Sequence, residues 1–312
     1  MNWKYKALLQ HAFSQTPFGE RLNYLFQRHV TKSLPTSDTI FPNHVALARE
    51  HMELVAKYLP RSSAEAAWYE FGAGWELIGP LLFYCLGVNR QVLVDIRHLL
   101  RIELVNHTIA TLQRLATSLA LPRVPLSFIE GHRPSAAVTV LRSRYGIDYR
   151  APCDARATGL PTASIDCITS TNTLEHVPRD DIVAILRECH RILRSDGIMS
   201  FRIDYQDHYS YFDRTISRFN FLRYSDRAWA FFNPGLHYQN RLRHRDHLAL
   251  VDAAGFEVLE ERRADPTAAD VTTLRNLSVP LRMRDYTPAE IGVRHAAIVL
   301  RKRPPPSSAA AV

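Results

Sequence analysis

Paired cysteines are absent from the sequence. Only four cysteines occur in 312 residues, and Cys85, Cys153, Cys167 and Cys189 lie far apart, with no C-x-x-C pair and no histidine at finger spacing. This pattern indicates neither a zinc module nor a disulfide framework. Long apolar runs are also absent: no stretch approaches the roughly 18 residues that a membrane span needs. Polar residues interrupt the N-terminal region, unlike a signal peptide, so we expect a cytoplasmic protein.

The sequence also lacks a polybasic block, although its formal net charge is +8. Positive charge attracts nucleic acid, anionic lipid or an acidic small molecule without identifying the partner. The arginines are spread along the whole chain. This dispersal weakens a nucleic-acid interpretation, because nucleic-acid proteins usually gather their basic residues on one face.

No convincing strand is present in residues 1–62. Residues 3–13, 18–31 and 43–58 each carry apolar residues at helical spacing,. We therefore predict an N-terminal helical cap that ends in a linker near residues 61–63.

Residues 63–303 show a different rhythm, in which short β-rich runs alternate with amphipathic stretches of helical length. The predicted strands are 67–71, 91–95, 147–151, 164–169, 198–203, 256–262 and 296–302, and the predicted helices are 77–86, 99–119, 181–193 and 243–254. This alternation predicts an α/β fold: a Rossmann-like, mostly parallel seven-stranded sheet with helices on both faces. Ligands of such sheets bind beyond the carboxyl ends of the strands. Residues 304–312 are of low complexity, and we predict a disordered tail.

Aromatic residues are concentrated after the predicted fifth strand. Residues 205–247 contain eleven of the 31 aromatic residues of the chain. We predict a lid insertion here, whose rings shape an acceptor pocket. A packed subdomain or a dimer interface is the alternative.

A glycine turn follows the first predicted strand, in the sequence W-Y-E-F-G-A-G-W-E of residues 68–76. Gly72 and Gly74 permit a tight turn that a ligand can approach closely. A dinucleotide fingerprint would need a third glycine at position 77, where Leu77 stands. Pyrophosphate is therefore disfavoured, and the absence of a Tyr-x-x-x-Lys pair also opposes a nicotinamide oxidoreductase.

Acidic residues end the next two predicted strands. Asp95 follows Gly74 by 21 residues and is placed to accept hydrogen bonds from two ribose hydroxyls,. A helix cap is the alternative role for this aspartate. Asp154 and Ala155 follow the third strand, and the runs L-P-T-A-S-I-D at 160–166 and L-E-H-V at 174–177 surround the fourth.

In this combination the chain resembles the class I S-adenosylmethionine-dependent methyltransferases, in the small-molecule branch described as methyltransferase-11-like. That family has an E-x-G-x-G turn after strand one, an acid at the end of strand two, an Asp-small pair after strand three and an "LP…FD" run before "LEHV". The resemblance covers residues 66–205 well and 248–302 loosely. The sequence departs from it at Glu76, where many relatives have a third glycine, and at Ile165, which replaces a phenylalanine.

The resemblance implies S-adenosylmethionine as cofactor and S-adenosylhomocysteine as its product. Glu70 would orient the turn or the amino group of the cofactor, Asp95 the ribose, and Asp154 with the Ala155 amide the adenine. The implied cofactor-binding residues are Glu70, Gly72, Ala73, Gly74, Asp95, Ile96, Asp154, Ala155 and Asn172. Capping, turn or loop roles are the alternatives for Glu70 and Asn172.

Methyl transfer is an in-line displacement, so the enzyme mainly positions the nucleophile and lets a proton leave. His208, just beyond the fifth strand, is the preferred general base because imidazole titrates near neutral pH; an ordinary loop histidine is the alternative. Tyr209 and Asn172 are further catalytic candidates. The predicted acceptor contacts are Tyr211, Arg223, Trp229, His237 and Arg241. No metal site is expected, because the histidines at 208, 237, 244 and 247, with Asp213, lack helix-type ligand spacing.

We therefore expect a methyltransferase acting on an O or N nucleophile of a small polar or anionic metabolite, without a membrane partner. A homodimer is possible, and the sequence does not identify the methyl acceptor. One alternative is a nucleic-acid methyltransferase, which is opposed because Thr171-Asn172-Thr173-Leu174 replaces the N/D-P-P-Y/F run of base-amine enzymes. A non-catalytic protein that uses the cofactor fold for interaction is the other.

Overall fold

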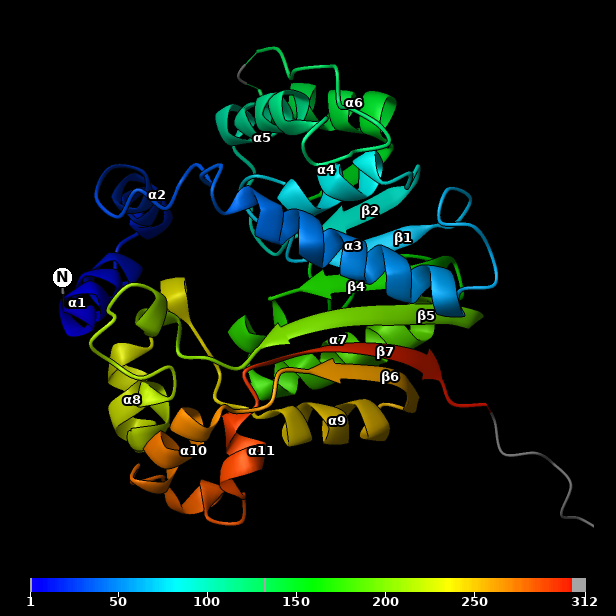
Figure 1. The fold of residues 1–312 in the computed structure, drawn as a ribbon. Coiled ribbons are helices and arrows are strands. Elements are labelled where there is room, and N and C mark those ends of the chain that lie inside the picture. The colour runs from blue at the N-terminus through cyan, green and yellow to red at the C-terminus, as the bar shows by residue number, and fades with distance from the viewer. Residues whose placement is uncertain (1, 132, 305–312) are drawn as a thin grey trace, which may run out of the picture.

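A seven-stranded sheet forms the centre of the fold (Figure 1). The computed structural model describes residues 2–131 and 133–304, so residues 305–312 of the predicted tail lie outside the described residues. The strand order is β3-β2-β1-β4-β5-β7-β6, with β7 antiparallel to both of its neighbours and the other pairings parallel. The strands are β1 (Trp68–Phe71), β2 (Gln91–Val94), β3 (Ile147–Arg150), β4 (Ile165–Thr171), β5 (Leu193–Asp204), β6 (Phe256–Arg263) and β7 (His295–Lys302). The predicted mostly parallel α/β sheet is confirmed.

Helices cover both faces of this sheet. The helices of the described residues are α1 (Trp3–Ser14), α2 (Gly19–His29), α3 (Phe41–Tyr58), α4 (Ile78–Cys85), α5 (Ile102–Leu115), α6 (Pro134–Tyr145), α7 (Arg179–Ile192), α8 (Asp226–Phe232), α9 (His244–Ala253), α10 (Ala268–Arg275) and α11 (Pro288–Gly292). Side chains alternate along β1, because successive residues of a strand point to opposite faces. Trp68 joins the core formed with α3 to α6, whereas Tyr69 and Phe71 join the core formed with α7 and α9.

The three N-terminal helices have different places in the fold. Val45, Leu54 and Val55 of α3 are buried in the first sheet core, so this helix belongs to the layer that covers the sheet. In contrast, α1 and α2 lie beyond one end of the sheet, and α1 lies between α2 and α8 (Figure 1). The helical character of residues 1–62 therefore agrees with the structure, while the boundary at residue 62 stays a prediction.

Residues 205–247 form a packed subdomain together with α1, α10 and α11. Their regular elements besides α8 are the short 3-10 helices η2 (His208–Tyr211), η3 (Asn220–Arg223) and η4 (Gly235–His237). The shared core contains Trp3, Ala7, Tyr209, Phe219, Phe221, Leu222, Trp229, Leu274, Met283 and Ile291. Most of the aromatic rings therefore pack against one another and α1, as in the packed-subdomain alternative, and the lid stays a prediction.

Within residues 2–131 and 133–304, no helix is both long and apolar enough to cross a membrane.

Candidate functional site

The glycine turn after β1 brings two ligand-facing loops together. Gly72 and Gly74 have φ angles of 80° and 72°, in the left-handed region that glycine tolerates best,. A Cβ atom on Gly72 would lie 2.4 Å from Cγ2 of Thr173, in the loop after β4. Glycine is therefore required at position 72 for these two loops to touch.

A cavity of about 180 Å³ lies beyond the ends of β1 and β2. Asp95 lies at its wall, and its Oδ2 accepts a hydrogen bond from the Gly74 amide at 3.2 Å, while Oδ1 accepts one from the Arg97 amide at 3.3 Å. Burial raises the pKa of Asp95, and these two amides oppose the rise. The residues that line this cavity include Gly72, Asp95, Ile96, Cys153, Asp154, Ala155, Arg156, Thr173, His176 and Asp181.

Asp154 is already paired in the structure. Arg156 contacts its Oδ2 at 2.6 Å and reaches Asp181 with its other terminal nitrogen, also at 2.6 Å. The hydrogen bonds from Arg156 lower the pKa of Asp154, so this carboxylate stays charged. A ligand amino group at Asp154 would therefore share the carboxylate with Arg156, a partner that the sequence analysis did not anticipate.

A second cavity, of about 240 Å³, shares Gly72 with the first. It is lined from the glycine turn by Glu70 and Ala73 and from the N-terminal region by Thr36, His44 and Leu47. Glu70 is only 6% exposed, and Thr169 Oγ1 donates a hydrogen bond to its Oε2 at 3.2 Å. Burial raises the pKa of Glu70 to about 7.

Hydrogen bonds and ring stacking hold the N-terminal region beside this second cavity. Glu76, which replaces the third glycine of many relatives, accepts hydrogen bonds from the amide and hydroxyl of Thr36 at 2.9 and 2.6 Å. The ring of Tyr24 stacks on Trp75 with centroids 5.3 Å apart. The departure at Glu76 therefore has a structural reason: its side chain anchors the segment before α3.

A third cavity, of about 340 Å³, adjoins the second at Asn172 and Leu47. Asn172 has a φ of 51°. Other residues that line this cavity are Asn43, Ala46, Arg202, Asp204, Gln206, Tyr211 and His295. Tyr211 is 58% exposed, and its hydroxyl donates to Asp204. Three cavities in series thus extend from Asp95 past Glu70 to Asp204.

His208 lies beside this third cavity. Its Nε2 is 3.5 Å from Oδ2 of Asp204, four residues earlier. Burial alone would raise the pKa of Asp204, but the neighbouring His208 and the Tyr211 hydroxyl lower it. Asp204 ends β5, so its place on the acceptor side agrees with the rule that ligands bind beyond the carboxyl ends of the strands,.

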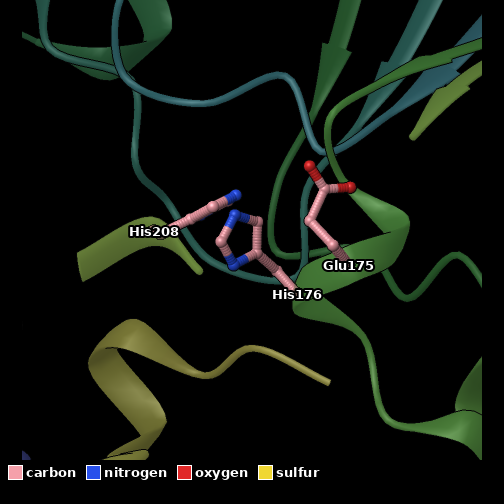
Figure 2. A group of neighbouring side chains, drawn as sticks. All are labelled: Glu175, His176 and His208. Carbon is pink, nitrogen blue, oxygen red and sulfur yellow. The ribbon is translucent and has the colours of Figure 1, made fainter. Parts of the chain in front are cut away.

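Figure 2 shows His208 close to Glu175 and His176, which end the 3-10 helix η1 (Leu174–His176). The rings of His176 and His208 have centroids 4.8 Å apart. Burial lowers the pKa of His176 to about 4 and raises that of Glu175 well above its usual range. The L-E-H-V run in the sequence gives no signal that His176 lies against His208.

Several predicted catalytic and acceptor residues lie away from the cavities. Tyr209 is 1% exposed and its hydroxyl donates to the Phe232 carbonyl at 2.9 Å, while Trp229 is buried in the same aromatic core. Arg241 is buried and bonds the Phe221 and Tyr224 carbonyls and Asp226. The structure therefore places the catalytic candidate Tyr209 and the acceptor candidates Trp229 and Arg241 in the packing of the aromatic subdomain, away from the cavities described above.

Arg223 and His237 also miss the cavities. Arg223 is exposed and lies near the ring of its neighbour Tyr224. His237 packs its ring against Tyr209, with centroids 4.8 Å apart, and lies outside the residues that line the third cavity. Among the predicted acceptor contacts, the structure places Tyr211 at that cavity.

Comparison with known proteins gives one match to a family model. Residues 133–201 match the family described as methyltransferase domain, a span of less than a quarter of the chain. No curated protein matches the sequence. The matched segment contains β3, β4 and the Asp154–Ala155 and L-E-H-V segments, whose positions in the cavities are described above.

Residues 133–201 thus form a segment that matches a methyltransferase domain, and this segment lies within a seven-stranded, mostly parallel α/β sheet. The family match implies S-adenosylmethionine as the cofactor.

Solved methyltransferases share the architecture at low sequence identity. The 1,6-didemethyltoxoflavin-N1-methyltransferase of Burkholderia thailandensis is 14% identical, with 91% of this chain and 87% of that chain covered and a TM-score of 0.47. A methyltransferase of Methanosarcina mazei is 12% identical over 80% of this chain and 97% of that chain, with a TM-score of 0.45. The geranyl diphosphate C-methyltransferase of Streptomyces coelicolor is 11% identical over 86% of each chain, with a TM-score of 0.42.

Proposed function

We propose that this methyltransferase transfers a methyl group to an oxygen or nitrogen nucleophile of a small polar or anionic metabolite. The observation that carries the proposal is the series of three cavities, which begins at a strand-ending aspartate and ends at a group of polar side chains around Asp204. The cofactor supplies a methyl group on a sulfonium. The side chains of the protein bind the cofactor, orient the nucleophile and accept its proton.

The first two cavities suit the two halves of the cofactor. Asp95 keeps oxygen lone pairs beyond its two amide contacts, and these can accept from ribose hydroxyls,. Ile96 and Ala155 supply apolar wall for a purine. Glu70, buried in the second cavity, offers a carboxylate to an ammonium group. No phosphate has to be neutralised, which fits a glycine turn without lysine or arginine.

The third cavity suits the acceptor. Asn172 lies between the second and third cavities and is placed to fix the orientation of a nucleophile. Arg202 gives the third cavity a positive group for an anionic substituent, although Glu50 already contacts it at 2.9 Å. His208 accepts the departing proton, and Asp204 at 3.5 Å stabilises the resulting imidazolium,.

Isothermal calorimetry with S-adenosylmethionine, S-adenosylhomocysteine and NAD tests the cofactor assignment. We expect the first two to bind and NAD not to bind. Asp95→Ala should weaken S-adenosylmethionine binding by at least tenfold, or about 1.4 kcal/mol. Asp148→Ala is the matched control, because Asp148 lies on β3 and forms ion pairs with Arg142 and Arg150 at the surface.

Two outcomes would contradict the proposal. Tight binding of NAD alone would overturn the methyltransferase assignment, and an unchanged affinity of Asp95→Ala would remove the ribose role. Incubation of the enzyme with isotope-labelled S-adenosylmethionine and pools of small metabolites, followed by product mass analysis, then identifies the acceptor.

A further inference from the structure

A carboxylate and two imidazoles meet between the first and third cavities. One ligand atom from each of Glu175, His176 and His208 lies within 4.8 Å of the others. Glu175 and His176 come from the turn after β4, and His208 approaches from η2, 32 positions later in the chain (Figure 2). The fold therefore builds this group from two separate loops at the ligand-binding end of the sheet.

The polar atoms of this group are buried without partners. Glu175 is 2% exposed, and neither of its carboxylate oxygens has a hydrogen-bond partner among the described residues. Nε2 of His208 is also buried, and its contact with Oδ2 of Asp204 at 3.5 Å does not have hydrogen-bond geometry. An unpaired carboxylate at this depth is strongly unfavourable unless a cation or a donor compensates it. The group therefore lacks a component that would satisfy both side chains at once.

One of the two histidines is already oriented as a metal ligand would be. Nδ1 of His176 lies 2.7 Å from the Tyr238 carbonyl oxygen and donates its proton to it. This bond fixes the tautomer, so Nε2 carries a free lone pair. Metal-bound histidines characteristically donate their other ring nitrogen to a carbonyl or carboxylate in this way.

We infer that Glu175, His176 and His208 bind a divalent cation of the zinc class. Two imidazoles and one carboxylate favour a borderline ion such as Zn²⁺ or Co²⁺ over Mg²⁺, which prefers an all-oxygen shell. Asp204, 3.5 Å from His208 Nε2, supplies the second negative charge that balances the ion. The ligand atoms of a tetrahedral zinc site are roughly 3.3 Å apart. Binding therefore requires the ligand atoms to approach one another by at most about 1.5 Å,.

Such an ion would compete with the proton for His208. This consequence rests on the proposed function, in which His208 accepts the proton of the methyl acceptor. A cation on the same nitrogen removes that lone pair, so saturation with Zn²⁺ should lower turnover. The binding inference itself does not depend on methyl transfer and is measured without cofactor or acceptor.

Metal titration of the chelator-treated full chain, free of any histidine tag, tests the site. Visible absorption of bound Co²⁺ reports its coordination, and calorimetry with Zn²⁺ and Mg²⁺ reports affinity and stoichiometry. We expect one Co²⁺ or Zn²⁺ per chain and no comparable response to Mg²⁺. Glu175→Gln, His176→Gln and His208→Gln should each weaken binding at least tenfold. His29→Gln removes an exposed histidine at the end of α2 and should leave binding unchanged.

The possible results separate clearly. Binding that is absent, equally strong for Mg²⁺, or unaffected by the variants would overturn the site. Circular dichroism establishes that each variant is folded. If Glu175→Gln does not fold, His176→Gln and His208→Gln decide the question. Failure of this metal site with normal S-adenosylmethionine binding would leave the proposed function intact, and the reverse result would leave the metal site intact.

Discussion

The buried carboxyl group of Glu70 should destabilise the cofactor-free protein as the pH rises. Its pKa is raised from 4.5 to about 7, because burial penalises the charged form. Between these two values the folded chain keeps the proton and the unfolded chain releases it. The unfolded state therefore binds fewer protons, and the free energy of unfolding falls across this interval.

The magnitude follows directly from the two pKa values. A difference of about 2.5 pH units corresponds to about 3 kcal/mol of stability lost above pH 7. Glu70→Gln imitates the protonated acid and removes this penalty. The variant should therefore be more stable than the wild type by about 3 kcal/mol at about pH 8 and by about 1 kcal/mol at about pH 5.5.

Urea unfolding of both proteins at the two pH values measures this difference. Glu65→Gln is the matched control, because Glu65 is an exposed glutamate shortly before β1, and it should show no such gain. Equal stability of wild type and Glu70→Gln at the higher pH would refute the reasoning. The same variant should bind S-adenosylmethionine less tightly in calorimetry, because it offers no negative charge to the ammonium group of the cofactor.

Three further results are expected. His208→Ala should lower turnover at least tenfold while cofactor affinity stays unchanged; a wild-type turnover profile between about pH 6 and 9 would remove His208 as the base. Trp229→Ala should cost about 3 to 5 kcal/mol in urea unfolding, because it empties the aromatic core, and a loss below 1 kcal/mol would contradict that packing. Burial lowers the pKa of His51 from 6.5 to about 4. Its stabilising contribution is therefore present above pH 6.5 and lost towards pH 4, so His51→Gln should flatten the acid limb of the stability profile by about 3 kcal/mol, and an unchanged slope would contradict this.

The sheet was predictable because each strand is a short apolar run between turn residues. Helix α6 was not predicted. Ala137, Leu141 and Tyr145 are buried at four-residue spacing, and this helical spacing could have indicated it. The helix ends at Gly146, whose φ is 65°, and a Cβ there would lie 1.9 Å from the Asn89 carbonyl oxygen. Glycine is therefore required at position 146 by close packing against a distant loop. No local sequence pattern indicates this packing.

In the candidate site, too, some positions could be predicted from local sequence and others depend on tertiary contacts. The positions of Asp95 and Asp154 at the ends of strands could be predicted, because the carboxyl ends of neighbouring parallel strands meet at one edge. The surroundings of Trp229 and Arg241 could not, because only tertiary contacts decide whether an aromatic ring or a guanidinium faces a ligand or a core. Thr36 lines the second cavity, and a hydrogen bond from its amide to Glu76, 40 positions away, holds it there.

The attachment of α1 to the aromatic subdomain has a consequence for how the chain matures. The Trp3 amide donates to Asp213 at 3.0 Å, a contact across 210 positions, and the Trp3 indole packs among rings from α8 and η2. During synthesis this first helix emerges long before its binding surface exists, and closing so long a loop is entropically costly. The sheet can therefore fold before α1 docks onto the aromatic subdomain. The loop that carries His208 then gains its contacts with α1 late in folding.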